Sequence, residues 1–486
     1  MLLAGAMALL AGCGGQKETL PGGETIDIAG DGAKDEFRVG YSRINITPME
    51  PVPLAGYGNT RRRMSDGFLD YIYVTCTAIT GTNNETVLFI SNDLCTMRQN
   101  EFTEQIKNKI IELTGIPFEN ININFSHTHS SVDNAASLMD IGSVQRFTDT
   151  WMESINKVVM EALADREPCE KMLYGTADLT SFNFVKHYFT DLDESVGDNH
   201  GGYATGTVTR HTTESNHNMY LLKFERKTKE PVLLSNFRAH PIFTGGDSKT
   251  DISSDYIHPL RENLEKMLGC KFAYLQGESG NQNAYSRISS EDVYNRDYLL
   301  WGEKASEIIA KTVNENMQEV AMGPVYCTAD RFDMKINHSE DGKLAIASQV
   351  YKYFTETNDR VGIWDMCYQN GFESPYHANS IITKHALGES LDVPVNAGVI
   401  GDFAFATAPF ETFDTNGDYV RANAPTKYTF VLGYSNEAWG YLPSQAAYEY
   451  GCYEADTTRF AAGSGEAMAS HQVDLLKSLW AVKEGK

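Results

Sequence analysis

Short apolar runs alternate with amphipathic helical patterns from residue 70 to residue 316, and this alternation limits the folds open to the chain. The runs resemble strands and cover residues 70–79, 85–93, 121–125, 218–225, 231–239 and 272–277. The helical patterns place apolar residues three and four positions apart over residues 101–113, 147–165, 257–268 and 296–316. No repeat or internal low-complexity linker interrupts them. The pattern predicts an α/β fold with one large mixed-sheet domain.

Composition supports one folded unit with a short leader. A chain of 486 residues with 42% hydrophobic content can bury a large core, which we place in residues 37–486. Residues 14–36 are rich in glycine and charge and are expected to be a flexible tether. The net charge of −24 is spread along the chain, and Arg61–Arg63 is a short basic run. Nucleic acid is therefore excluded as a partner.

The N-terminus predicts export. Residues 1–13, MLLAGAMALLAGC, resemble a bacterial lipoprotein signal with Cys13 as the lipidated residue. The run is shorter than the roughly 20 apolar residues that span a bilayer. We expect an exported protein that contacts a bacterial membrane, on its periplasmic or cell-surface side, through this anchor only.

Of eight cysteines, none forms a CxxC pair, so a zinc ribbon is excluded. Without Cys13 seven remain, and at least one thiol stays unpaired.

Histidines follow two of the apolar runs. His127 and His129 come directly after residues 121–125, and their spacing in an extended chain points both rings to one side. His240 follows residues 231–239 and precedes a proline. The alternatives are a surface histidine pair and a structural histidine in a loop. Glu411 follows another apolar run, and two histidines with one carboxylate are a usual catalytic zinc set that leaves a position for water.

A glycine-containing loop follows the run at residues 272–277. Its members Gly277, Ser279, Gly280 and Asn281 could present backbone NH groups to a substrate as an oxyanion hole, although glycine turns after strands are common. The polar segment 251–256, DISSDY, precedes a helical pattern and is expected to cap that helix and shape the wall of the site.

Five motifs in this order resemble the catalytic domain of the neutral ceramidase family. They are SHTHSS, FRAHP with ISSDY, YLQGESGN, PFET, and NEAWGYLPS with YGCYE; VGYSRINITP and LAGYG extend the resemblance towards the N-terminus. The resemblance implies one zinc ion per chain, held by His127, His240, Glu411 and Tyr441. It also implies catalytic roles for His129 and for Tyr453, which lies twelve residues after Tyr441 as in the family.

The chain departs from the family pattern at three places. Asn283 stands where ceramidases carry a serine implicated in catalysis. The segment NFVKHY replaces an Asn-Arg-Ser segment, so Lys186 or His187 takes the place of an arginine. The C-terminal immunoglobulin-like domain of established ceramidases is not expected here.

The resemblance implies hydrolysis of an amide by metal-activated water. Zinc would lower the pKa of its bound water from about 15.7 towards roughly 7. His129 would act as base or orient the water, and Tyr453 and Asn283 would donate hydrogen bonds to the oxyanion. The expected substrate is an N-acyl sphingoid lipid. The alternatives are a zinc hydrolase of a smaller amide or ester and a surface binding lipoprotein with a relic site. No obligate protein partner is expected.

Overall fold

The computed structural model describes residues 17–19, 25–27, 35–57, 63–197, 206–246, 248–357 and 359–486. Its largest sheet has nine strands. Eight follow one path, and a ninth, β18 (Gln318–Val320), pairs with β8. In spatial order the eight are β16 (Lys271–Gln276), β14 (Val232–Phe237), β13 (Asn218–Arg226), β8 (Glu167–Asp178), β3 (Arg38–Asn45), β5 (Tyr73–Thr80), β6 (Thr86–Asn92) and β7 (Ile121–Phe125).

This sheet is divided into two halves that face each other. The ladder between β8 and β3 is confined to Arg38 and Val39, whereas the neighbouring ladders are long. One buried cluster contains side chains from both halves, among them Phe89 of β6 and Leu275 of β16. β7 and β16 lie at opposite ends of the strand order yet are in contact. The carboxyl ends of distant strands therefore meet in space.

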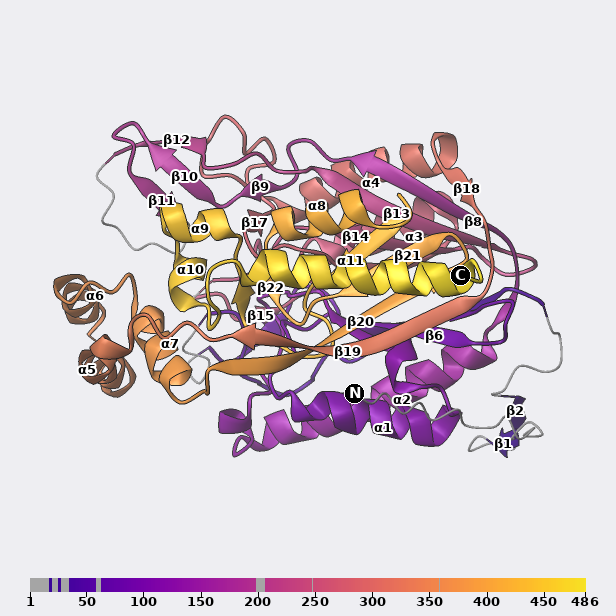
Figure 1. The fold of residues 1–486 in the computed structure, drawn as a ribbon, viewed down its shortest axis with the longest axis horizontal. Helices are drawn as coiled ribbons and strands as arrows, with labels where there is room; N and C mark the ends of the chain where they lie inside the picture. Colours follow the sequence, from indigo (N-terminus) through magenta and orange to yellow (C-terminus); the bar gives the residue numbers. More distant parts are fainter. Residues whose placement is uncertain are drawn as a thin grey trace.

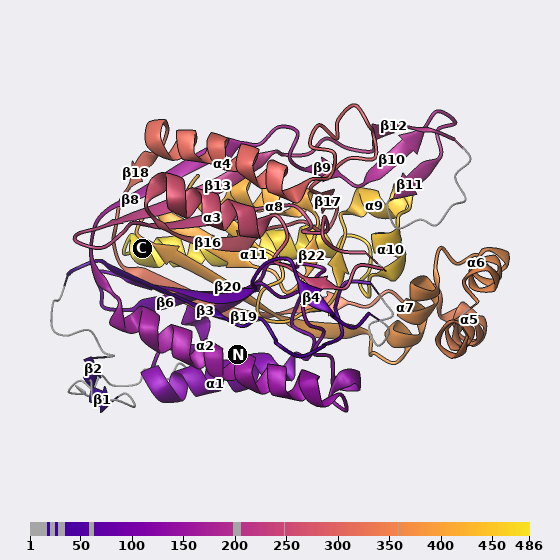
Figure 2. The same ribbon diagram turned by 180° about the vertical axis from the view of Figure 1, so that it is seen from behind.

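Helices cover the outer faces of both halves (Figures 1 and 2). The helices α1 (Glu101–Thr114) and α2 (Gly142–Ala164) pack on β5–β7, and α3 (Ile257–Leu268) and α4 (Tyr298–Glu315) pack on β13, β14 and β16. Each has an apolar face at helical spacing, as its sequence pattern predicts.

A four-stranded sheet adds a further layer to the central core. It consists of β19 (Val325–Lys335), β20 (Ser390–Ile400), β21 (Phe403–Thr407) and β23 (Thr429–Leu432). On its outer side lie α8 (Asp414–Asn423) and α11 (Ser464–Lys483). Between β19 and β20 the chain forms α5 (Leu344–Glu356), α6 (Arg360–Gln369) and α7 (Pro375–His385), which project from one side of the molecule (Figure 1).

Short elements complete the fold near the strand ends. The pairs are β4 (Gly67–Phe68) with β15 (Asp251–Ile252), β9 (Phe184–Val185) with β17 (Gln282–Asn283), and β22 (Glu411–Thr412) with β24 (Tyr441–Leu442). A three-stranded sheet joins β10 (His187–Thr190), β11 (Ser195–Gly197) and β12 (Val208–His211). The short helices α9 (Gln445–Tyr450) and α10 (Tyr453–Thr457) follow β24.

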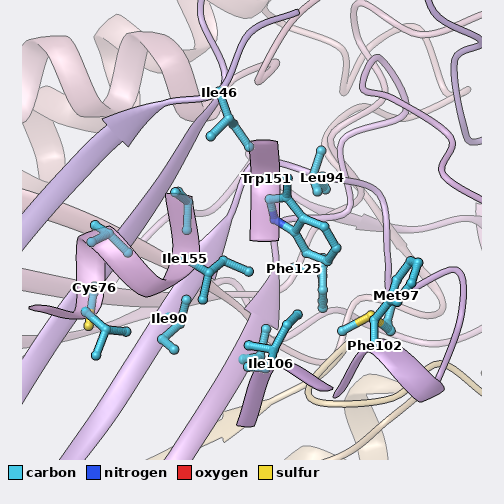
Figure 3. Close-up of a cluster of buried hydrophobic side chains, with 14 of the residues drawn as sticks. Ile46, Cys76, Ile90, Leu94, Met97, Phe102, Ile106, Phe125, Trp151 and Ile155 are labelled. Atoms are coloured by element: carbon cyan, nitrogen blue, oxygen red, sulfur yellow. The ribbon is translucent and has the colours of Figure 1, made fainter. Parts of the chain in front are cut away.

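The core beneath β7 fixes the strand that leads into His127. Figure 3 shows Trp151 of α2 packed among Phe125, Leu94 and Phe102. The buried indole NH of Trp151 donates to Asn92 Oδ1 at 2.9 Å. Because Phe125 is fully buried at the last position of β7, the chain leaves the sheet at a defined point.

Some expectations lie outside this description or differ from it. Cys13 and the predicted signal at residues 1–13 lie outside the described residues. Within residues 14–36, which are expected to be a flexible tether, β1 (Lys17–Thr19) and β2 (Thr25–Asp27) form an antiparallel pair. The seven cysteines after Cys13 are all free. In the described part of the chain, no helix is both long and apolar enough to cross a membrane.

Candidate metal centre and active site

Two strand ends carry the site histidines. His127 lies just beyond β7, and His240 lies just beyond β14. Asn124 of β7 holds the two sheet halves together: its Oδ1 accepts from Gln276 N at 2.8 Å, and its Nδ2 donates to Gln276 O at 3.2 Å. Loops at the carboxyl ends of strands are the usual ligand sites of α/β proteins.

Both histidine rings are oriented through Nδ1. His127 Nδ1 lies 2.6 Å from Cys95 O, and His240 Nδ1 lies 3.0 Å from Gln282 O. A carbonyl accepts a hydrogen bond from Nδ1–H, so in the neutral form of each ring the lone pair lies on Nε2, as in metal-binding histidines. His127 also has a φ of 68°, in the left-handed region that non-glycine residues rarely occupy. Backbone strain of this kind is concentrated at functional sites.

The two Nε2 atoms converge on one carboxylate. Glu411 Oε2 lies 3.4 Å from His127 Nε2 and 3.3 Å from His240 Nε2. The three ligand atoms all lie within 4.8 Å of one another. Both histidines are buried, and the Glu411 side chain is 19% exposed. The chemistry of this donor set, with Nδ1 of each ring already bonded, fits a zinc ion with three protein ligands and an open position.

Tyr441 and Tyr453 lie beside this group. Tyr441 is paired directly with Glu411 in the parallel β22–β24 register. The Tyr453 ring lies 5.9 Å from the Tyr441 ring, in an edge-to-face arrangement. Burial, followed by the nearby charge of Glu411, raises the pKa of Tyr441 well above its usual value. A phenol that is hard to ionise would need a cation close by to become phenolate.

His129 shares the site with the proposed ligands. Its Nε2 lies 3.2 Å from His127 Nε2, and its ring packs edge-on against Tyr57. Its buried Nδ1 has no hydrogen-bond partner among the described residues. Burial and the charges of His127 and His240 hold the pKa of His129 well below its usual value. A neutral imidazole at this position can accept a proton.

The electrostatics of the metal-free group favour a proton where a metal would bind. Although burial opposes protonation of His127, the charges of Cys95 and Glu411 raise its pKa to about 10. Burial and the charge of Lys186 lower the pKa of His240 to about 4. Burial also opposes ionisation of Glu411, but His127 and His240 hold its pKa well below the usual range. The pocket therefore stabilises positive charge between these three side chains.

Lys186 reaches the site and has a buried counter-ion. Its Nζ lies 2.8 Å from Glu454 Oε1 and 5.2 Å from the centre of the Tyr441 ring. The other oxygen of Glu454 lies 2.6 Å from His187 Nε2. Of the two candidates for the place of the family arginine, Lys186 is thus the one beside the proposed ligands. His187 serves as a partner of Glu454.

The backbone NH groups of Gly277, Ser279 and Gly280 are already used within the fold, which corrects their expected part in an oxyanion hole. Gly277 N donates to Phe237 O, Ser279 N to Gly277 O, and Gly280 N to Thr412 O. The Asn281 side chain donates to Asp414 at 2.8 Å and accepts from Asp414 N at 3.0 Å. A β-carbon on Gly280 would lie 2.2 Å from Glu411 O. The loop therefore packs against the backbone of Glu411 and Thr412 and supports it.

Asn283 is also placed next to a proposed ligand. It is buried, pairs with Phe184 in the β9–β17 ladder, and forms a parallel bridge with His240.

The expectation that DISSDY caps the following helix is wrong. No side chain caps α3, and Asp255 instead accepts from Thr244 N at 2.7 Å. The segment does shape the wall, since Thr128 Oγ1 donates to Ser253 O at 2.8 Å.

Two residues of the site were not found from the sequence. Cys95 supplies the carbonyl that orients His127. Tyr434 stacks on His127 with ring centres 4.0 Å apart, and its hydroxyl lies 3.5 Å from Glu411 Oε2 while accepting from Ser279 Oγ. No local motif marks either residue, because both are brought to the site by the fold.

Comparison with known proteins relates this fold to one enzyme class. No family model and no curated protein matches the sequence. The structure is similar to neutral ceramidase from Pseudomonas aeruginosa, with a TM-score of 0.68 and 16% identity over 92% of this chain and 75% of that chain. A ceramidase complexed with C2 gives a TM-score of 0.66 and 15% identity over the same shares. The chain thus has the fold of neutral ceramidase, as the motifs predict.

Proposed function

We propose that this protein is a zinc-dependent hydrolase of the neutral ceramidase family that cleaves the amide bond of an N-acyl sphingoid lipid. The observation that carries the proposal is the convergence of His127 Nε2 and His240 Nε2 on Glu411 Oε2 in a ceramidase fold. His127, His240 and Glu411 would hold the ion, with Tyr441 as a fourth ligand. When bound, zinc supplies Lewis-acid polarisation of the carbonyl and a more acidic water.

The side chains around the ligands would divide the remaining work. His129, neutral and with an unpartnered Nδ1 among the described residues, would accept the proton of the attacking water. Tyr453, whose pKa is raised by burial, would stay protonated and donate a hydrogen bond to the oxyanion. Asn283, bridged to His240, would be a second donor. Lys186 would stabilise negative charge as it develops.

A second candidate is hydrolysis of a smaller or more polar amide or ester. It is favoured by a cavity of about 290 Å³ that reaches Glu411 and Tyr434 and has Arg98 and Arg459 in its wall. A binding protein with a relic site is disfavoured, because buried polar side chains left without a metal cost free energy. A protein that no longer needed the metal would be free to lose these side chains. The predicted anchor at Cys13 would hold the enzyme at a bacterial membrane, where lipid amides are available.

The proposal is tested with a fluorescent N-acyl sphingosine and protein lacking residues 1–13. Zinc content is measured on the wild type and on His240→Ala. We expect turnover and about one zinc per chain in the wild type and loss of both in the variant. Zinc without turnover would favour the smaller substrate. The absence of both zinc and turnover in the wild type would contradict the proposal.

A further inference from the structure

Two cavities that share three lining residues lie beside Glu411 of the proposed metal centre. The inner cavity, of about 290 Å³, is lined by Glu411 and Tyr434 of the site. The outer cavity, of about 610 Å³, is lined by Gln99, Asn100 and Trp439 among others. Both are lined by the same three residues, Arg98, Ala438 and Arg459. A molecule that reaches Glu411 by this route passes two guanidinium groups.

Arg459 has no carboxylate partner among the described residues. Its Nη1 donates to Trp439 O at 2.5 Å, and burial lowers its pKa, with no nearby acidic group to oppose the effect. In a chain with a net charge of −24, a half-buried arginine without a carboxylate partner among the described residues is unusual.

Unlike Arg459, Arg98 has a carboxylate partner, because Asp133 Oδ1 lies 3.0 Å from its Nε. Its side chain is nevertheless 39% exposed, whereas Asp133 is buried. The Arg98 guanidinium is therefore paired with Asp133 through Nε and Nη2 but remains accessible at the cavity wall.

We infer that this cavity binds an anionic group of the substrate, of the carboxylate, sulfonate or phosphate type, between Arg98 and Arg459. The inference rests on the proposed function and narrows it: the preferred amide carries a negative charge on one side of the scissile bond. A planar guanidinium with several fixed donors suits such oxyanions, and charge-assisted hydrogen bonds are roughly twice as strong as neutral ones. Glu101 at the outer cavity and Glu411 at the inner one are the lining carboxylates. The Glu411 charge would be neutralised by a bound metal.

The test compares two ligands of equal chain length, N-octanoylglycine and N-octanoylethanolamine. Calorimetric titration of the zinc-loaded wild type, completed before measurable amine is released, measures binding, and amine release on longer incubation measures hydrolysis. We expect the anionic ligand to bind on the order of tenfold tighter and to have the lower KM. Arg459→Gln should remove this preference, Arg459→Lys should retain part of it, and the control Arg210→Gln, at an exposed site, should leave it unchanged.

The outcomes separate the inference from the proposed function. Equal binding of the two ligands by the wild type, a result that requires no variant, would overturn the inference. A preference that survives in folded Arg459→Gln would also overturn it. Selective binding of the anionic ligand by a protein that does not hydrolyse N-acyl sphingosine would support the anion site and contradict the proposed function. Hydrolysis without a preference for the charged ligand would support the proposed function and contradict the anion site.

Discussion

Asn124 forms a reciprocal pair of hydrogen bonds with the backbone of Gln276, with Oδ1 accepting at 2.8 Å and Nδ2 donating at 3.2 Å. The pair links β7, which leads to His127, with β16, which leads to the loop behind Glu411. Nδ2 also donates to Gly433 O at 2.7 Å. One buried amide thus connects three segments that carry or support the proposed ligands.

Replacing Asn124 with leucine should destabilise the protein strongly. The change removes the side-chain partner of the buried Gln276 NH and carbonyl, at about 1–3 kcal/mol each, and leaves Gly433 O with Ser435 Oγ alone. We expect the free energy of unfolding in urea to fall by roughly 3 kcal/mol or more. Asn423→Ala is the control, because Asn423 is exposed and donates only to the Tyr419 carbonyl of its own helix. Equal stability of the two variants would refute this role.

Gly280→Ala should weaken metal binding. A β-carbon at Gly280 would lie 2.2 Å from Glu411 O, so the backbone that carries the proposed carboxylate ligand must move. We expect reduced zinc content after dialysis at a limiting free zinc concentration. Gly342→Ala is the matched control, since a β-carbon there meets nothing within 4 Å. If Gly280→Ala retained zinc as fully as the control, the loop would not be supporting Glu411.

Zinc affinity should rise with pH over the neutral range. In the metal-free protein the pKa of His127 is about 10, so below that pH a proton must leave before Nε2 can bind zinc. His240, with a pKa of about 4, is already neutral. The dissociation constant should therefore fall at least about tenfold for each pH unit between pH 7 and pH 9, as measured by competition with a chelator. An affinity independent of pH would contradict release of a proton from His127 on zinc binding.

Lys186 and Glu454 should be strongly coupled. Both side chains are buried, so Lys186→Met leaves the Glu454 carboxylate without its lysine counter-ion and should cost about 3–5 kcal/mol of stability. The double variant with Glu454→Gln should lose much less than the sum of the single changes. The exposed pair Arg210 and Asp193 is the control cycle, with coupling within about 1 kcal/mol. Additive losses at Lys186 and Glu454 would contradict a buried ion pair.

Local patterns predicted the strand ends that carry the site but not everything that surrounds them. The strand before His127 and the helices α1 and α3 lie where periodicity places them, because their apolar spacing reflects the face that they bury. The oxyanion expectation at Gly280 was wrong, because which NH groups remain free depends on neighbours distant in sequence, here Thr412. Tyr434 and Arg459 were missed for the same reason.

Zinc titration of the metal-depleted protein tests the central claim most directly, with release of a fluorescent fatty acid from an N-acyl sphingosine as the readout. The account predicts that activity rises linearly and stops rising at one equivalent of zinc, and that His127→Ala and Glu411→Ala remain inactive at any zinc concentration. Full activity of the metal-depleted protein, or turnover by either variant equal to the wild type, would contradict it.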